Sequence, residues 1–146
     1  MSLLPDDNSG RITRATPARP FFLTLLAIIL FLFGLLAFFG SLFLWGQGFV
    51  LAPPPGINYA LPVADIVVNA PASILAAVGL WRLRRYGYLA AYFVAGIYLY
   101  ASVFILIDAF VERPPDFWTI IVPQALAVVV SVALLLYLPR VRSVFR

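Results

Sequence analysis

The chain has 146 residues, of which 64% are hydrophobic and 11% charged, and its formal net charge is +4. A soluble domain is about half apolar and about one quarter charged, because polar side chains must cover its surface. The composition therefore excludes an ordinary soluble domain and predicts an all-α membrane protein whose outer surface faces lipid. The length suits one compact unit.

The sequence contains neither cysteine nor histidine, and all ten of its basic residues are arginine. Without cysteine there are no disulfides, thiolate nucleophiles or thiolate-bound metals. Without histidine the usual ligand of haem, zinc and copper is missing. The arginines stand in short flanks beside apolar segments, which is typical of topology determinants and not of a nucleic-acid interface. The sequence predicts neither a cofactor nor a nucleic-acid partner.

Residues 1–20 are polar, with three prolines and three arginines, and we expect them to form a cytoplasmic tail. The apolar run that follows exceeds the ~7–15 residues of a signal-peptide core, so we expect it to remain in the protein. It predicts a first span over about 21–48. A helix of this length exceeds the ~30 Å of membrane hydrocarbon and must tilt, protrude or end early. Gly46 and Gly48 favour an end near Trp45.

Residues 51–60 contain three successive prolines, which exclude a helix and predict a short, stiff outer loop. The second span is predicted over 61–81, where Pro71 should distort the helix. A tight turn leads to the third span, 86–110, which should form an antiparallel hairpin with the second.

Pro114 and Pro115 force the next break. The fourth span is predicted over 118–138. Residues 21–146 are therefore expected to form a four-helix transmembrane bundle built from two helical hairpins.

The orientation follows from the arginines. Nine of the ten lie in the tail, in the turn at 82–85 and after the fourth span, and these three segments share one side of a four-span protein. The opposite side holds Arg113, beside Glu112 and Asp116. Arginine-rich flanks remain on the cytoplasmic side, so the sequence predicts a multi-pass protein of the cell membrane with both termini in the cytoplasm.

Polar side chains inside the predicted spans are the candidate functional residues. They are Asp65, Asn69, Asp108 and Gln124. At 1.5 Å per residue all four lie in the outer half of the membrane, roughly 5–13 Å deep. Asp65, Asn69 and Ser73 are four residues apart and share one helical face. That face should turn inward, since a polar stripe toward lipid is costly.

Two interpretations of these polar residues stay open. One is an outward-facing polar cavity with Asp65 as its main ionisable group. The other is an interhelical hydrogen-bond cluster that fixes packing, at about 0.6 kcal/mol per bond, and it is preferred for Asn69 and Gln124. Asp108 lies one turn before Glu112 and is expected to be a solvated helix end.

Small residues recur at intervals of four on the second and third spans, a pattern that lets helices approach closely. They are Ser73 and Ala77 on the second span, and Gly87, Ala91 and Ala95 on the third. We expect these two spans to pack tightly below the polar residues.

The first span carries eight phenylalanines between residues 21 and 49 and is apolar on every face. Such a helix can face lipid, a flat hydrophobic ligand or another subunit. The sequence also lacks a nucleophile–base pair and a set of metal ligands, so we do not expect an enzyme.

The leading hypothesis is a non-catalytic accessory or structural subunit of a larger membrane complex. Its partners would be membrane lipids, other membrane subunits contacted through residues 21–50, or a second copy of the chain. The alternatives are a small transporter or channel with a polar cavity around Asp65, and a lipid-, quinone- or pigment-binding membrane protein.

Overall fold

The computed structural model describes residues 20–48, 60–115 and 117–145, which are helical and contain no strand. Four helices are long and apolar enough to cross a membrane, in agreement with the number and order predicted. They span Phe21–Gly46, Pro62–Trp81, Arg85–Glu112 and Phe117–Val144. The predicted tail (1–20) and outer loop (51–60) lie outside the described residues, apart from residues 20 and 60.

The ends of the α-helices lie within two residues of the predicted ends, but the fourth span extends further, to Val144. Helix α1 (Phe21–Gly46) ends at the first glycine of the predicted fraying region. Helix α4 (Arg85–Glu112) is slightly longer than predicted at both ends. Helix α5 (Phe117–Tyr137) passes at Leu138 into a 3₁₀ helix, η2 (Leu138–Val144), so the chain stays helical beyond Pro139. Proline is tolerated there because it stands in the first turn of η2, where an N–H has no helical partner.

The second span consists of three segments: α2 (Ala60–Ala64), the π-helix η1 (Asp65–Asn69) and α3 (Ala70–Trp81). The backbone N–H of Ala70 donates to the carbonyl of Asp65, five residues back. Pro71 then occupies the first turn of α3. Since proline has no N–H to donate, the helix accommodates it by a wide turn directly before it. The sequence predicted a distortion at this proline but not its π-helical form.

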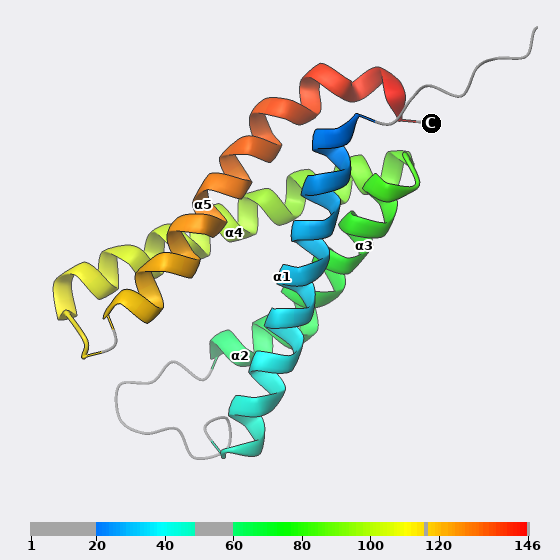
Figure 1. The fold of residues 1–146 in the computed structure, drawn as a ribbon. Coiled ribbons are helices and arrows are strands. Elements are labelled where there is room, and N and C mark those ends of the chain that lie inside the picture. The colour runs from blue at the N-terminus through cyan, green and yellow to red at the C-terminus, as the bar shows by residue number, and fades with distance from the viewer. Residues whose placement is uncertain (1–19, 49–59, 116, 146) are drawn as a thin grey trace, which may run out of the picture.

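Each spanning helix packs on the one before it in the chain: α3 packs on α1, α4 on α3, and α5 on α4 (Figure 1). A single hydrophobic core joins all four helices in the half of the molecule that contains the arginine-rich end. Its fully buried leucines are Leu23 and Leu30 on α1, Leu80 on α3, Leu134 on α5 and Leu138 on η2. At this end Phe22 also packs edge-to-face on Tyr137, with ring centres 4.8 Å apart, so α1 meets α5.

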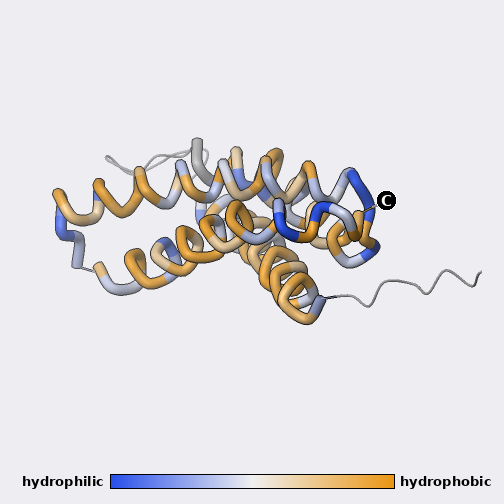
Figure 2. The backbone as a smooth tube through the Cα atoms, turned by 90° about the horizontal axis from the view of Figure 1, so that it is seen from above, coloured by the Kyte–Doolittle hydropathy of each residue, from blue (hydrophilic) through white to orange (hydrophobic). Residues whose placement is uncertain are grey.

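Beyond this core the two helix pairs diverge (Figure 1). Helix α1 stays with the second span, and α4 stays with α5. Residues 42–47 at the end of α1 are exposed on every face. In Figure 2 the hydrophilic residues gather toward the ends of α4 and α5, and the lengths between them are mostly hydrophobic. The predicted bundle is therefore closed at the arginine-rich end and open at the other.

The interface between α3 and α4 contains the small residues that the sequence singled out. Buried positions include Ser73, Ala77, Gly87, Ala91 and Ala95. The closest approach is between Gly87 and Gly79, because a Cβ added to either glycine would overlap the backbone of the other. Sequence reasoning identified Gly87 but missed Gly79 as its partner.

The turn between α3 and α4 is closed by two backbone hydrogen bonds. The N–H of Arg84 donates to the carbonyl of Gly79 at 2.9 Å, and the N–H of Leu83 donates to the carbonyl of Leu80 at 3.2 Å. This is the Schellman arrangement of a helix C-terminus. Leu83 occupies the left-handed position with φ of 52°, which usually favours glycine. Its side chain packs against the hydrophobic core, which offsets that strain.

Candidate functional site

The polar face predicted on the second span turns toward other helices. The side-chain nitrogen Nδ2 of Asn69 donates to Oδ1 of Asp65 at 2.6 Å. Asn69 is 9% exposed and Ser73 is completely buried. The hydroxyl of Ser41, a buried residue on α1, lies beside the carboxyl group of Asp65. The pair Asp65–Asn69 thus sits on the π-helical segment, next to α1.

One turn further along, the hydroxyl groups of Ser73 and Tyr98 are 2.9 Å apart and share a hydrogen bond. The ring of Tyr98 packs edge-to-face on Phe33, with ring centres 5.5 Å apart. Three helices, α1, α3 and α4, therefore meet at Tyr98. This bond satisfies a tyrosine hydroxyl that would otherwise be unpaired among apolar side chains.

The side-chain oxygen of Asn69 is buried without a hydrogen-bond partner among the described residues. An unpaired polar atom in an apolar environment costs about 1–3 kcal/mol, because it loses its bonds to water and gains none in return. The site thus contains one acceptor that the described part of the chain leaves unsatisfied.

The other two predicted polar residues do not join this cluster. Asp108 is exposed near the end of α4, and Gln124 is half-buried on α5. Both belong to the second helix pair, which diverges from the first (Figure 1). Among the described residues, no hydrogen bond links either of them to Asp65 or Asn69. Gln124 is therefore not brought to Asp65 and Asn69, because the two helix pairs separate in this half of the molecule, and the exposure of Asp108 fits the solvated helix end expected for it.

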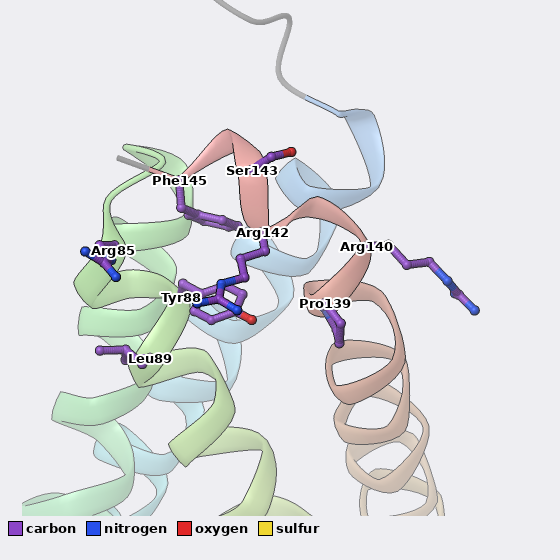
Figure 3. A pocket seen from close by; sticks show the side chains of 8 residues that line it. All are labelled: Arg85, Tyr88, Leu89, Pro139, Arg140, Arg142, Ser143 and Phe145. Carbon is purple, nitrogen blue, oxygen red and sulfur yellow. The ribbon is translucent and has the colours of Figure 1, made fainter.

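A groove of about 720 Å³ lies at the arginine-rich end, between the first turns of α4 and the 3₁₀ helix η2 (Figure 3). Its polar lining consists of Arg85, Tyr88, Arg140, Arg142 and Ser143. Sequence reasoning interpreted these arginines as topology determinants and missed the groove. The spacing of residues along the chain could not reveal it, because η2 is brought against α4 by the tertiary fold.

A second groove, of about 310 Å³, lies between α1 and α3 and is almost entirely apolar. It is lined by Ala27, Ile28, Phe31, Ala77, Val78, Trp81 and Arg82. The aromatic surface of α1 that the sequence associated with lipid or a flat ligand thus contains a recess. Neither groove borders Asp65.

The side chains present limit the chemistry. Within the described ranges, no group of three acidic residues lies close enough to hold a metal ion. The serines of the helix interfaces have no histidine to activate them, since the chain has none. The arrangement can accept hydrogen bonds, exchange a proton at Asp65 and attract anions at the arginine-rich groove.

Comparison with protein-family models, with curated proteins and with solved structures found no match for this chain.

Proposed function

We propose that this chain crosses the cell membrane four times, with both termini in the cytoplasm, and acts as a non-catalytic accessory subunit of a larger membrane complex. The orientation is supported by the distribution of charge. Arg82, Arg84 and Arg85 at one turn and Arg140 and Arg142 beyond α5 stand at the same end of the helices. Basic flanks of this kind remain on the cytoplasmic side during insertion.

The observation that carries the subunit proposal is the divergence of the helix pairs in the half that holds the polar side chains. On one pair, the buried side-chain oxygen of Asn69 has no partner among the described residues, and on the other pair Gln124 is half-buried. Polar groups at this depth are costly toward lipid and seek a partner inside protein. A helix of another subunit, packed between the pairs, would give the half-buried Gln124 a polar partner and cover the exposed end of α1.

The topology can be tested by cysteine labelling, because the native chain has no cysteine. We expect Glu112→Cys, at the exposed end of α4, to react with a membrane-impermeant maleimide on intact cells. Ser143→Cys, exposed on η2, should react only after permeabilisation. Reaction of Ser143→Cys on intact cells at the rate of Glu112→Cys would contradict the proposed orientation.

The subunit role can be tested by photo-crosslinking at two positions of equal exposure. Phe43, at the open end of α1, and Leu89, on α4 beside the core, are each 65% exposed. A photoreactive phenylalanine at position 43 should give one protein adduct of fixed mass that co-purifies at a constant ratio in mild detergent. The same probe at position 89 should give lipid adducts. Lipid adducts alone at both positions would reject the subunit role, and an adduct of twice the chain's mass would identify a second copy as the partner.

A small transporter or channel remains the alternative, and the π-helical segment favours it. π-Helical segments are rare, and those that do occur are often found at functional sites. This one carries Asp65 and Asn69, the polar pair at membrane depth. Under this alternative, Asp65→Asn should reduce ion or proton flux in liposomes at least about tenfold, since it removes the ionisable group. Asp108→Asn, exposed at a helix end, is the matched control and should leave the flux unchanged.

A further inference from the structure

The arginine-rich groove combines side chains from two segments far apart in the sequence. Arg85 and Tyr88 come from the first turn of α4, and Arg142 and Ser143 come from η2. In Figure 3 the side chain of Arg142 extends toward Tyr88, while Arg140 is directed away from the groove. Two guanidinium groups, from segments far apart in the sequence, therefore border one recess.

The charges of this groove have no counterpart nearby in the described chain. The first turn of α4 contains no acidic residue, and neither does the first turn of η2. The described acidic residues, Asp65, Asp108 and Glu112, belong to the open half of the molecule. Two guanidinium groups around one recess, with no acidic residue of the described chain beside them, create a positive potential that attracts an anion.

The remaining lining is apolar and makes the groove amphipathic. Leu89, Pro139 and Phe145 contribute to it, and the ring of Phe145 packs on that of Tyr88 with centres 5.2 Å apart. The groove lies where α4 begins and α5 ends, at the level of the predicted membrane surface. A ligand with a phosphate group at the membrane surface and hydrocarbon chains inside the membrane matches both the basic and the apolar parts of the lining.

We propose that this groove binds the headgroup of an anionic phospholipid from the cytoplasmic leaflet. The guanidinium groups of Arg85 and Arg142 contact its phosphate, and guanidinium groups can donate two parallel hydrogen bonds to phosphate oxygens. Leu89 and Pro139 contact the hydrocarbon part of the lipid next to the headgroup. The inference rests on the membrane insertion proposed above, but not on the subunit role.

Native mass spectrometry of the full chain in mild detergent tests this site. Phosphatidylglycerol should bind more tightly than phosphatidylcholine, and Arg85→Gln combined with Arg142→Gln should weaken phosphatidylglycerol binding about 30-fold. Arg113→Gln, at the opposite end of the molecule, removes a like charge and should leave binding unchanged. Replacement of both groove arginines by lysine keeps the charge but loses the paired guanidinium hydrogen bonds, so it should weaken binding less than the glutamine pair does.

Several results would overturn the proposal. An equal loss with the lysine and glutamine pairs would show that charge is not the determinant. Displacement of the lipid by equimolar inorganic phosphate would assign the groove to a small anion. An unchanged preference in the glutamine pair would place lipid binding elsewhere. Failure of the membrane orientation would appear separately, in the cysteine-labelling pattern of Glu112→Cys and Ser143→Cys.

Discussion

Replacement of Gly79 by alanine is expected to lower the free energy of unfolding by about 3 kcal/mol, the upper part of the range for overpacked interiors. The added Cβ would overlap the backbone of Gly87 on α4, so no side-chain rotation can relieve the contact. The two helices would have to separate at their closest point. That separation would also strain the backbone hydrogen bond from Arg84 to the carbonyl of residue 79.

Gly96→Ala is the matched control for this substitution. Gly96 lies on α4, the helix that Gly79 approaches, but a Cβ at this position would meet nothing within 4 Å. Alanine should be neutral there or stabilise the protein by up to about 1 kcal/mol, since glycine is a poor helix former. Equilibrium unfolding in mixed detergent micelles, followed by circular dichroism, measures both variants. Equal stabilities for Gly79→Ala and Gly96→Ala would rule out the tight approach of α3 and α4.

The second large effect is expected for Leu30→Ala on α1. Leu30 is completely buried in the core shared by all four helices. Its truncation should cost about 2 kcal/mol, the low end of the range for buried leucines. The low end applies because lipid is as apolar as the core, so the loss comes from packing and not from transfer out of water.

Leu36→Ala on the same helix provides the comparison. Leu36 is 66% exposed, and its truncation should change stability by less than about 0.5 kcal/mol. The difference between the two variants, measured by the same unfolding assay, reports which part of α1 lies in the core. A larger loss for Leu36→Ala than for Leu30→Ala would place the core in the opposite half of the molecule.

The number, order and approximate ends of the spanning helices could be predicted from the sequence, because long apolar runs bounded by proline and arginine leave few alternatives. The packing of α3 on α4 could also be predicted, since Ala77 and Ala91 belong to rows of small residues that only a close helix neighbour explains. The contact between Asp65 and Asn69 followed from their spacing of four residues.

The separation of the helix pairs could not be predicted. In a water-soluble helix the apolar stripe shows which face is buried, but here nearly every face is apolar. Leu30 and Leu36 are the same residue type on one helix, yet one is buried and the other exposed. The position of Gln124 relative to Asp65 depends on which helix faces are buried, and the sequence does not show this. The formation of the groove beside Arg142 also depends on these buried faces, because it requires η2 to lie against α4.

The neighbour-to-neighbour packing of the helices has a consequence for biogenesis. Since α3 rests on α1, α4 on α3 and α5 on α4, every major interface joins segments that emerge from the ribosome one after the other. In a chain inserted as proposed, each span can therefore dock as it leaves the translocon, without waiting for a distant partner. The late step is the meeting of Phe22 with Tyr137, which links the first and last spans. A nascent chain halted before this tyrosine should already hold its first three spans in their final arrangement.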